Sequence, residues 1–261
     1  TEAKKYGIVN IASSSQHNYI SIPPLKSWQI NKNTSYIHIC LNETVHGVEF
    51  FGCPDLKSID RGNVPLIVDM SSNILSKNID FTNIDLAYAS AQKNIGPAGL
   101  TLVIIKESLL NEGNKRGLKV CPSVFDYRNL IKTDSLYNTP PTYSIYMAGL
   151  MFDWLIEKGG IDVIEKINLE KSKLLYEALD LSDFYQTPVP YQYRSRVNVP
   201  FFLPNQELND IFIKGAKKQG LINLKGHTAV GGLRASLYNS MPIEGVKELV
   251  NWIKEFEINY G

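Results

Sequence analysis

The sequence predicts an α/β protein in which a large domain on a mostly parallel sheet precedes a small C-terminal α+β domain. Residues 64–68 are apolar throughout, which is typical of a strand covered on both faces. Residues 143–158 place apolar side chains at helical spacing, and that helix ends at Gly159-Gly160. Beyond the two glycines, helices alternate with short strands, so we place the domain boundary after residue 160.

The first domain, residues 1–160, carries a series of short apolar stretches separated by polar loops. The stretch 64–68 ends on Asp69, and the stretch 99–105 begins with a glycine. The first seven residues resemble the last turns of a helix that closes on Gly7. The expected strands are 8–12, 36–40, 64–68, 85–90 and 99–105.

The second domain, residues 161–261, has fewer strands and longer helices. Its apolar residues recur with helical spacing over three segments, and two short β-type stretches lie between these segments. The expected elements are helix 161–179, strand 196–203, helix 206–219, strand 232–236 and helix 243–260.

Composition limits the classes of function. The 261 residues are 44% hydrophobic, and 27 Lys and Arg nearly balance 26 Asp and Glu, so disorder and strong attraction to nucleic acid or an anionic membrane are disfavoured. No apolar run approaches the roughly 18 residues that span a bilayer. Three widely spaced cysteines indicate neither a disulfide framework nor a metal site. We expect a cytoplasmic enzyme with small-molecule substrates.

Two residues in the first domain suggest a site for pyridoxal 5'-phosphate. Such a site needs an amine beside the cofactor aldehyde and a buried carboxylate that keeps the pyridine nitrogen protonated. Lys93 follows a predicted strand in a short loop, and Asp69 ends another strand. Taken alone the pair is weak evidence, because most loop lysines are solvated and many strands end in Asp.

Short sequence motifs around these residues make the suggested cofactor site more specific. In order along the chain, 42–44 (NET), 68–72 (VDMSS), 91–99 (AQKNIGPAG), 138–142 (NTPPT), 225–227 (KGH) and 230–236 (VGGLRAS) resemble the phosphoserine aminotransferase family. The resemblance covers the whole chain and implies a class V, fold type I enzyme that uses pyridoxal 5'-phosphate. It also implies a homodimer with shared active sites.

The resemblance assigns roles to five residues of the first domain. Lys93 matches the Schiff-base lysine and Asp69 the partner of the pyridinium nitrogen. Thr44 matches the residue that hydrogen-bonds the phenolic oxygen of the cofactor. Gln92 and Ser71 match residues that make further contacts around the cofactor.

Four further residues are assigned in the same way. Asn138 and Thr139 match the pair that reaches across a dimer interface to the phosphate of the neighbouring cofactor, although a simple turn would also explain them. Arg234 matches the arginine that grips the substrate carboxylate, and without the resemblance it would be a charge on a strand face. His227 matches a histidine near the substrate phosphate, whereas a lone histidine in a glycine-rich loop is usually structural.

The chain departs from the family pattern in two places. Thr228 stands where the family commonly has an arginine, so one charge for the substrate phosphate is absent. Arg194 and Arg196 lie near a predicted strand and could replace it, but a solvated or interface role is the simpler expectation. The pattern also implies about a hundred residues before Thr1, including a glycine-containing turn at a helix N-terminus that cradles the cofactor phosphate.

The implied activity is transfer of an amino group between glutamate and 3-phosphohydroxypyruvate, which gives phosphoserine and 2-oxoglutarate. One alternative is a catalytically silent fragment or paralogue that keeps the fold but binds the cofactor weakly or not at all. A dinucleotide-binding domain is a third reading, but neither Gly96–Gly99 nor Gly231-Gly232 supplies GxGxxG between a strand and a helix.

Overall fold

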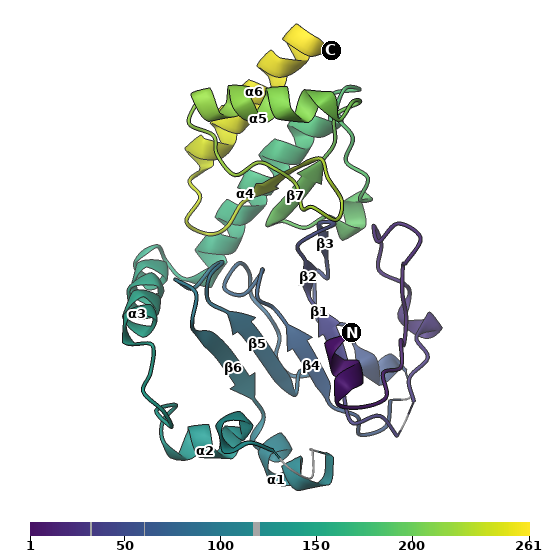
Figure 1. Ribbon diagram of the computed structural model, residues 1–261, viewed down its shortest axis with the longest axis vertical. Helices are drawn as coiled ribbons and strands as arrows, with labels where there is room; N and C mark the ends of the chain where they lie inside the picture. The colour runs from purple at the N-terminus through teal and green to yellow at the C-terminus, as the bar shows by residue number, and fades with distance from the viewer. Residues whose placement is uncertain (32, 60, 117–120) are drawn as a thin grey trace.

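The computed structural model describes residues 1–31, 33–59, 61–116 and 121–261. It forms two lobes stacked along the long axis of the molecule, as Figure 1 shows. We call residues 37–157 the sheet lobe and residues 161–260 the helical lobe. Each lobe has its own cluster of buried apolar side chains. The predicted boundary after residue 160 falls in the turn between the lobes and stays a prediction.

The sheet lobe is built on a four-stranded sheet with the order β1-β4-β5-β6. Its strands are β1 (Ile37–Cys40), β4 (Leu66–Asp69), β5 (Leu86–Ser90) and β6 (Thr101–Ile105). The first three are parallel, and β6 runs antiparallel to β5 at the edge. This mostly parallel sheet, with helices around it, confirms the predicted α/β class.

Alternation along the strands separates the two faces of this sheet. Ile37 and Ile39 of β1 and Leu66 and Val68 of β4 are buried in the core of the lobe. The opposite face carries polar side chains, Asp69 among them, because successive residues of a strand point to opposite sides. Burial of the apolar face fixes the register of the strands, and this register aligns their ends.

A short hairpin connects the sheet lobe to the helical lobe. Strands β2 (Asn42–Glu43) and β3 (Val48–Glu49) pair antiparallel around a turn that contains Gly47. Gly47 has a φ of +75°, and a Cβ there would lie 2.4 Å from Pro200 Cδ, so only glycine fits. Its carbonyl accepts a hydrogen bond from the Ser195 amide at 2.8 Å.

Three helices follow the sheet. α1 (Glu107–Arg116) and α2 (Tyr127–Lys132) lie below it in Figure 1, and α3 (Thr142–Glu157) runs beside it toward the helical lobe. The side chain of Asp126 caps α2 by accepting from the Arg128 amide. Ala148 of α3 is buried in the core of the sheet lobe.

The helical lobe packs three helices against a two-stranded sheet. Its elements are α4 (Ile161–Asp180), β7 (Asn198–Phe201), α5 (Glu207–Lys218), β8 (Leu233–Ser236) and α6 (Ile243–Tyr260). β7 and β8 pair antiparallel. Phe201, Phe212 and Phe256 are fully buried, and Phe212 meets each of the other two rings edge to face. This small α+β module agrees with the predicted class.

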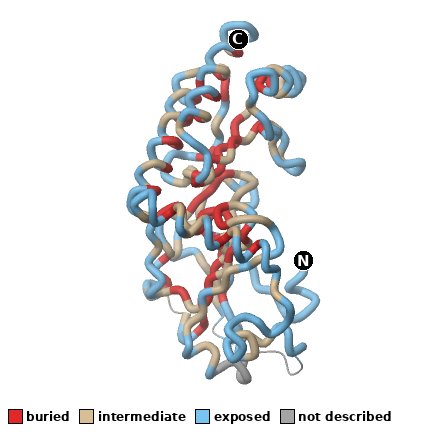
Figure 2. Tube along the Cα trace, turned by 90° about the vertical axis from the view of Figure 1, so that its left-hand side faces the viewer, coloured by how far each residue is buried: buried red, intermediate tan, exposed pale blue. Residues whose placement is uncertain are grey.

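Most expected elements are confirmed, with ends shifted by a few residues. The strand expected at 8–12 is wrong, because this segment pairs with no other strand in the described part of the chain and Ile8 is fully exposed. Figure 2 shows the same contrast, since the N-terminal segment is mostly exposed while buried residues run through both lobes. Only a 3-10 helix, Glu2–Lys5, forms at the start. No helix among the described residues has the length and apolar character needed to cross a membrane.

Buried polar groups join the two lobes. Asn42 of β2 donates to Asn198 of β7 at 2.9 Å and to Ser72 at 2.8 Å. Glu49 of β3 is fully buried, pairs with Lys77 at 2.6 Å, and accepts from the Arg196 amide at 2.9 Å. Buried groups of this kind are stable only where their hydrogen bonds are satisfied, so they restrict how the lobes can sit against each other.

Lys171 of α4 carries a buried amine, and its lowered pKa makes the stability of the chain depend on pH. Its side chain is fully buried, and Nζ donates to the carbonyls of Tyr238 at 2.9 Å and Met241 at 3.0 Å. Burial lowers its pKa from 10.5 to about 8. Between these values the unfolded chain binds more protons than the folded one, so the contribution of Lys171 to the free energy of unfolding rises with pH in that window.

We therefore expect the wild-type chain to gain stability relative to Lys171→Met as pH rises from about 8 to about 10. Below that window the charged amine is held in a buried site at the full cost of desolvation, whereas methionine does not ionise. Urea unfolding of both proteins at several pH values measures the difference. A difference independent of pH would show that the amine does not titrate with a lowered pKa.

Candidate functional site

The candidate site lies where the parallel strands end. In open α/β sheets, ligands bind outside the carboxyl ends of the strands. Thr44 follows β1 through the hairpin, Asp69 is the last residue of β4, and Lys93 lies in the loop after β5. The register pairs Cys40 with Asp69 and Asp69 with Tyr88, so the carboxyl ends of these three strands lie at the same edge of the sheet, with β5 extending to Ser90. Three sequence-predicted residues therefore meet at one edge of the sheet.

Lys93 is the centre of this group. Its Nζ donates a hydrogen bond to Thr44 Oγ1 at 3.0 Å, and the side chain is half-buried. Burial lowers the pKa of Lys93, and the Arg234 cation lowers it further, while the carboxylates of Asp69 and Glu43 act in the opposite direction. The net shift favours the neutral amine, which is the nucleophilic form.

The loop that carries Lys93 is held rigidly. Both Ile95 and Gly96 donate their amides to the carbonyl of Ala91, at 3.0 and 2.8 Å. Ser144 of α3 donates its hydroxyl to the carbonyl of Ala98 at 3.0 Å. The loop is thereby pinned at both ends, so the amine of Lys93 is presented from a fixed backbone.

Asp69 is fixed by the chain around it. Its Oδ1 accepts from the Ser71 amide at 2.8 Å, and Ser71 Oγ in turn accepts from the Ser90 amide at 3.1 Å. Ser71 therefore ties the end of β4 to the end of β5. One carboxylate oxygen of Asp69 is occupied in this way, and the carboxylate keeps acceptor capacity for a further donor.

Two residues beside Asp69 were not identified from the sequence. Tyr88 has its pKa raised by burial and by Asp69, whose carboxylate accepts from the phenol. His38 Nε2 lies 3.1 Å from the Tyr88 hydroxyl, and the two rings stack. Burial lowers the pKa of His38. The strand candidates contained both residues, but only the observed register shows that they share a face with Asp69.

Thr44 lies in a turn that Glu43 organises. The carboxylate of Glu43 accepts from the Val45 amide at 3.0 Å and from the His46 amide at 2.6 Å. These bonds close the turn between β2 and β3. They leave the hydroxyl of Thr44 directed at Lys93 rather than at its own backbone.

Arg234 reaches this site from the other lobe. It lies on β8, where its amide donates to the carbonyl of Leu224 at 2.9 Å. Its Nη1 lies 3.4 Å from the carbonyl of Thr44, a long hydrogen bond between the lobes. The structure thus brings Arg234 to Lys93 and Thr44, as a role in binding a substrate carboxylate requires.

Four of the sequence-predicted residues are exposed and not bonded to this group. Gln92 is exposed beside Lys93. Asn138 and Thr139 are exposed in the segment between α2 and α3, on the side of the sheet lobe away from the hairpin (Figure 1). His227 is exposed in the turn before β8, where its Nδ1 accepts from the Ala229 amide at 3.2 Å. Their predicted roles stay predictions.

Arg194 and Arg196 are engaged elsewhere. Arg194 pairs with Asp180 at 2.6 Å and lies over the Tyr176 ring. Arg196 pairs with Glu165 at 3.1 Å and lies over the Phe51 ring of the sheet lobe. Both guanidinium groups therefore serve contacts within the helical lobe and between the lobes, in keeping with the expected interface role.

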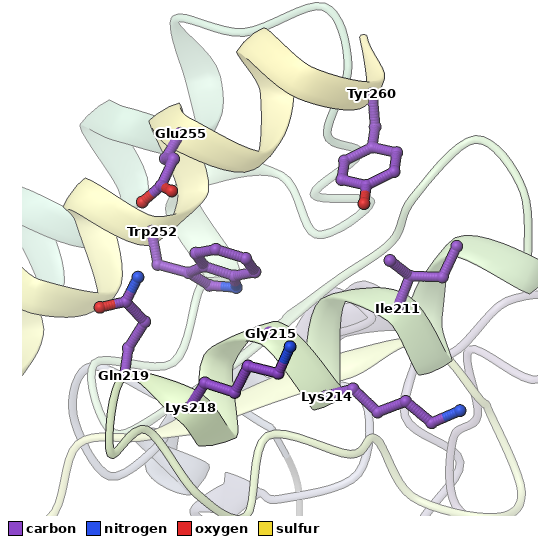
Figure 3. A pocket seen from close by; sticks show the side chains of 8 residues that line it. All are labelled: Ile211, Lys214, Gly215, Lys218, Gln219, Trp252, Glu255 and Tyr260. Carbon is purple, nitrogen blue, oxygen red and sulfur yellow. The ribbon is translucent and has the colours of Figure 1, made fainter.

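A separate cavity of about 460 Å³ lies in the helical lobe between α5 and α6, as Figure 3 shows. Its lining includes Lys218, Trp252 and Tyr260. None of the sequence-predicted site residues lines it. Among the described residues, no cluster of three or more His, Cys, Asp or Glu side chains could hold a metal ion.

The chain belongs to the aminotransferase class-V family, whose sequence profile matches residues 2–249. A curated relative from Janthinobacterium sp. (strain Marseille), named phosphoserine aminotransferase, is 51% identical over all of this chain and 69% of its own length. The chain therefore belongs among the phosphoserine aminotransferases of that family.

Solved structures agree with this placement. The phosphoserine aminotransferase from Bacillus circulans subsp. alkalophilus superposes with a TM-score of 0.92 at 41% identity, covering all of this chain and 70% of that one. The pyridoxal-phosphate-bound phosphoserine aminotransferase from Trichomonas vaginalis superposes with a TM-score of 0.88 at 36% identity, over 97% of this chain and 70% of that one. The fold type I architecture of these enzymes is the fold of this chain.

We expect Lys93→Ala to abolish covalent attachment of pyridoxal 5'-phosphate. In the wild-type chain, borohydride should fix the cofactor to the peptide that contains Lys93, because this amine has a lowered pKa and a hydroxyl neighbour. Mass spectrometry of the reduced protein locates the adduct. Lys173→Ala, which removes an exposed lysine of α4, is the matched control and should keep the adduct. An adduct that persists in Lys93→Ala would contradict the assignment.

Proposed function

We propose that this chain transfers an amino group between glutamate and 3-phosphohydroxypyruvate, with pyridoxal 5'-phosphate held at the end of the parallel strands. The observation that carries the proposal is the position of Lys93. Its half-buried amine has a lowered pKa, donates to Thr44, and has Asp69 and Arg234 in its electrostatic surroundings. These groups lie in a chain whose relatives at about 50% identity are named phosphoserine aminotransferase.

The side chains present fit pyridoxal 5'-phosphate. The amine of Lys93 suits the aldehyde carbon, the hydroxyl of Thr44 suits the phenolic oxygen, and the carboxylate of Asp69 suits the ring nitrogen. Gln92 and Ser71 are proposed as further neighbours of the cofactor. When bound, the cofactor supplies an electron sink that stabilises negative charge developing at the substrate α-carbon.

Each of the central side chains has a defined task in the transfer. Lys93 binds the cofactor and, once displaced by a substrate amine, carries a proton to and from the substrate α-carbon as a general base. Its lowered pKa suits this task, because a base works best when its pKa lies nearer the working pH. Asp69 keeps the ring nitrogen protonated, and Arg234 orients the substrate carboxylate with its planar guanidinium fork.

Exposed residues are assigned to contacts that a single chain does not make. Asn138 and Thr139 are proposed to bind the cofactor phosphate of a second copy in a homodimer with shared active sites. Their exposure supports this, because side chains that serve a neighbouring chain must be free of their own. His227 is proposed as a donor to the substrate phosphate. We propose a cytoplasmic location, which agrees with three free cysteines.

The alternative of a silent fragment or paralogue is not favoured by the relatives named above, which carry the name phosphoserine aminotransferase. The two hypotheses differ in one measurable property. A silent chain would form the visible absorbance band that borohydride bleaches only at high concentrations of pyridoxal 5'-phosphate, or not at all. The titration therefore separates the two before any turnover is measured.

We expect Asp69→Asn to lower turnover on the order of a thousandfold or more, which is about 4 kcal/mol of barrier. The amide carries no charge, so the ring nitrogen loses the partner that keeps it protonated. Steady-state rates with phosphoserine and 2-oxoglutarate measure the loss. Asp183→Asn, at an exposed position of the helical lobe, is the control and should keep the wild-type rate. Near-normal turnover in Asp69→Asn would refute this role.

A further inference from the structure

Three buried asparagines join the two lobes next to Lys93, and we call Asn94, Asn168 and Asn239 the asparagine seam. Their residues are 2%, 2% and 6% exposed. Asn94 belongs to the loop of the sheet lobe that carries Lys93, Asn168 lies on α4, and Asn239 follows β8, the strand of Arg234. The seam therefore links the segments that bear both site cations.

Each seam side chain binds one of three successive backbone carbonyls. Asn94 donates to the carbonyl of Ile74 at 2.9 Å. Asn239 donates to Leu75 at 2.8 Å, and Asn168 donates to Ser76 at 3.0 Å. These carbonyls belong to the turn that follows β4 and Asp69. The turn thus receives one donor from the sheet lobe and two from the helical lobe.

The seam residues also bind one another. Oδ1 of Asn94 accepts from the backbone amide of Asn239 at 3.0 Å, and Oδ1 of Asn239 accepts from Asn168 Nδ2 at 2.9 Å. Asn94 and Asn239 each use a donor and an acceptor on one short side chain, whereas Asn168 donates through its Nδ2 to two oxygens. Alanine would leave buried carbonyls and amides without partners, and aspartate would lack the donor.

The turn that the seam holds is itself strained. Leu75 adopts a φ of +61°, in the left-handed region that non-glycine residues seldom occupy. Such a backbone persists only where surrounding contacts fix it, and the bond from Asn239 to the Leu75 carbonyl is one such contact. The helical lobe therefore helps to hold the backbone that follows Asp69.

The seam joins the chain segments that carry Arg234 and Lys93. Arg234 and Asn239 lie on the same short stretch of chain, which runs from β8 into the turn before α6. When Asn239 is bonded to Asn94, that stretch is fixed against the loop of Lys93, and Arg234 reaches the carbonyl of Thr44. The hydrogen bonds of the seam therefore hold the segment that carries Arg234 near the loop that carries Lys93.

We propose that Asn94 and Asn239 are positioning residues that hold the strand of Arg234 against the loop of Lys93 and thereby align carboxylate binding with the reacting amine. The alignment serves the aminotransferase activity proposed above, on which its functional meaning rests. The positioning role of these two asparagines involves only groups of this chain, so it can be tested in protein without added cofactor.

The primary test is the pKa of Lys93 in Asn94→Ala and Asn239→Ala. Trace acetylation with acetic anhydride at a series of pH values, read by mass spectrometry on the Lys93 peptide, gives this pKa in cofactor-free protein. Losing the seam should admit water and let Arg234 withdraw. Both changes raise the pKa of Lys93 toward its ordinary value, against the unchanged carboxylates of Asp69 and Glu43.

A matched control separates positioning from general loss of stability. Tyr185→Phe removes a buried hydroxyl that donates to the carbonyl of Ile253 at 2.8 Å inside the helical lobe. It weakens the fold without touching the seam, so the pKa of Lys93 should stay at the wild-type value. Asn94→Ser, which keeps a short polar group, serves if Asn94→Ala does not fold and should give a smaller rise.

A double variant tests the route through Arg234. In an Arg234→Met background the cation is already absent, so Asn94→Ala should raise the pKa of Lys93 by less than it does in the wild-type chain. In steady state, Asn239→Ala should lower kcat/KM for phosphoserine by roughly 10-fold to 100-fold, since small misplacements of substrate-positioning groups cost about that much.

The outcomes are distinct. An unchanged pKa of Lys93 in folded Asn94→Ala, Asn94→Ser and Asn239→Ala would overturn the inference, as would an equal rise in Tyr185→Phe. A rise in the seam variants alone supports it. If the rise is found but the wild-type chain never turns over phosphoserine, the proposed function fails while the seam stands.

Discussion

The candidate site depends on the partial burial of one amine. Lys93 must lose enough water for its pKa to fall, yet it must stay beside carboxylates that favour its charged form. The first condition is met near the carboxyl ends of the parallel strands, where the amine lies against Thr44 of the hairpin and is partly buried. The helical lobe supplies the rest by adding Arg234, so the electrostatics of the amine are set by two lobes at once.

The interface between the lobes contains buried polar groups with directional hydrogen bonds, and this has a physical consequence. An apolar interface tolerates sliding, since burial depends on area and hardly on direction. Hydrogen bonds such as those from Asn42 to Asn198 and from the Arg196 amide to Glu49 are directional, and a small displacement leaves buried groups unsatisfied. The polar interface therefore specifies one orientation, which is what placing Arg234 requires.

Sequence periodicity located most of the fold. Helix 243–260 was predicted at its observed ends, and the strands before Asp69 and Lys93 were found from apolar runs. The strand expected at 8–12 failed because an apolar stretch becomes a strand only where another strand pairs with it. The β2–β3 hairpin was missed for a related reason, since its two-residue strands depend on the contact of Gly47 with Pro200, which no local pattern reveals.

Only part of the site could be predicted from the sequence, because local motifs do not show which residues tertiary packing brings together. Sequence motifs shared with the family identified Thr44, Asp69, Lys93 and Arg234, which the structure brings together. Those motifs could not show that Tyr88 lies beside Asp69, because strand register depends on tertiary packing. The helical lobe buries its own aromatic core, and the hairpin and the asparagine seam are among the contacts that join the strand of Arg234 to the loop of Lys93. The proposed carboxylate-binding and proton-transfer groups thus lie on different lobes, and the alignment between them depends on directional hydrogen bonds.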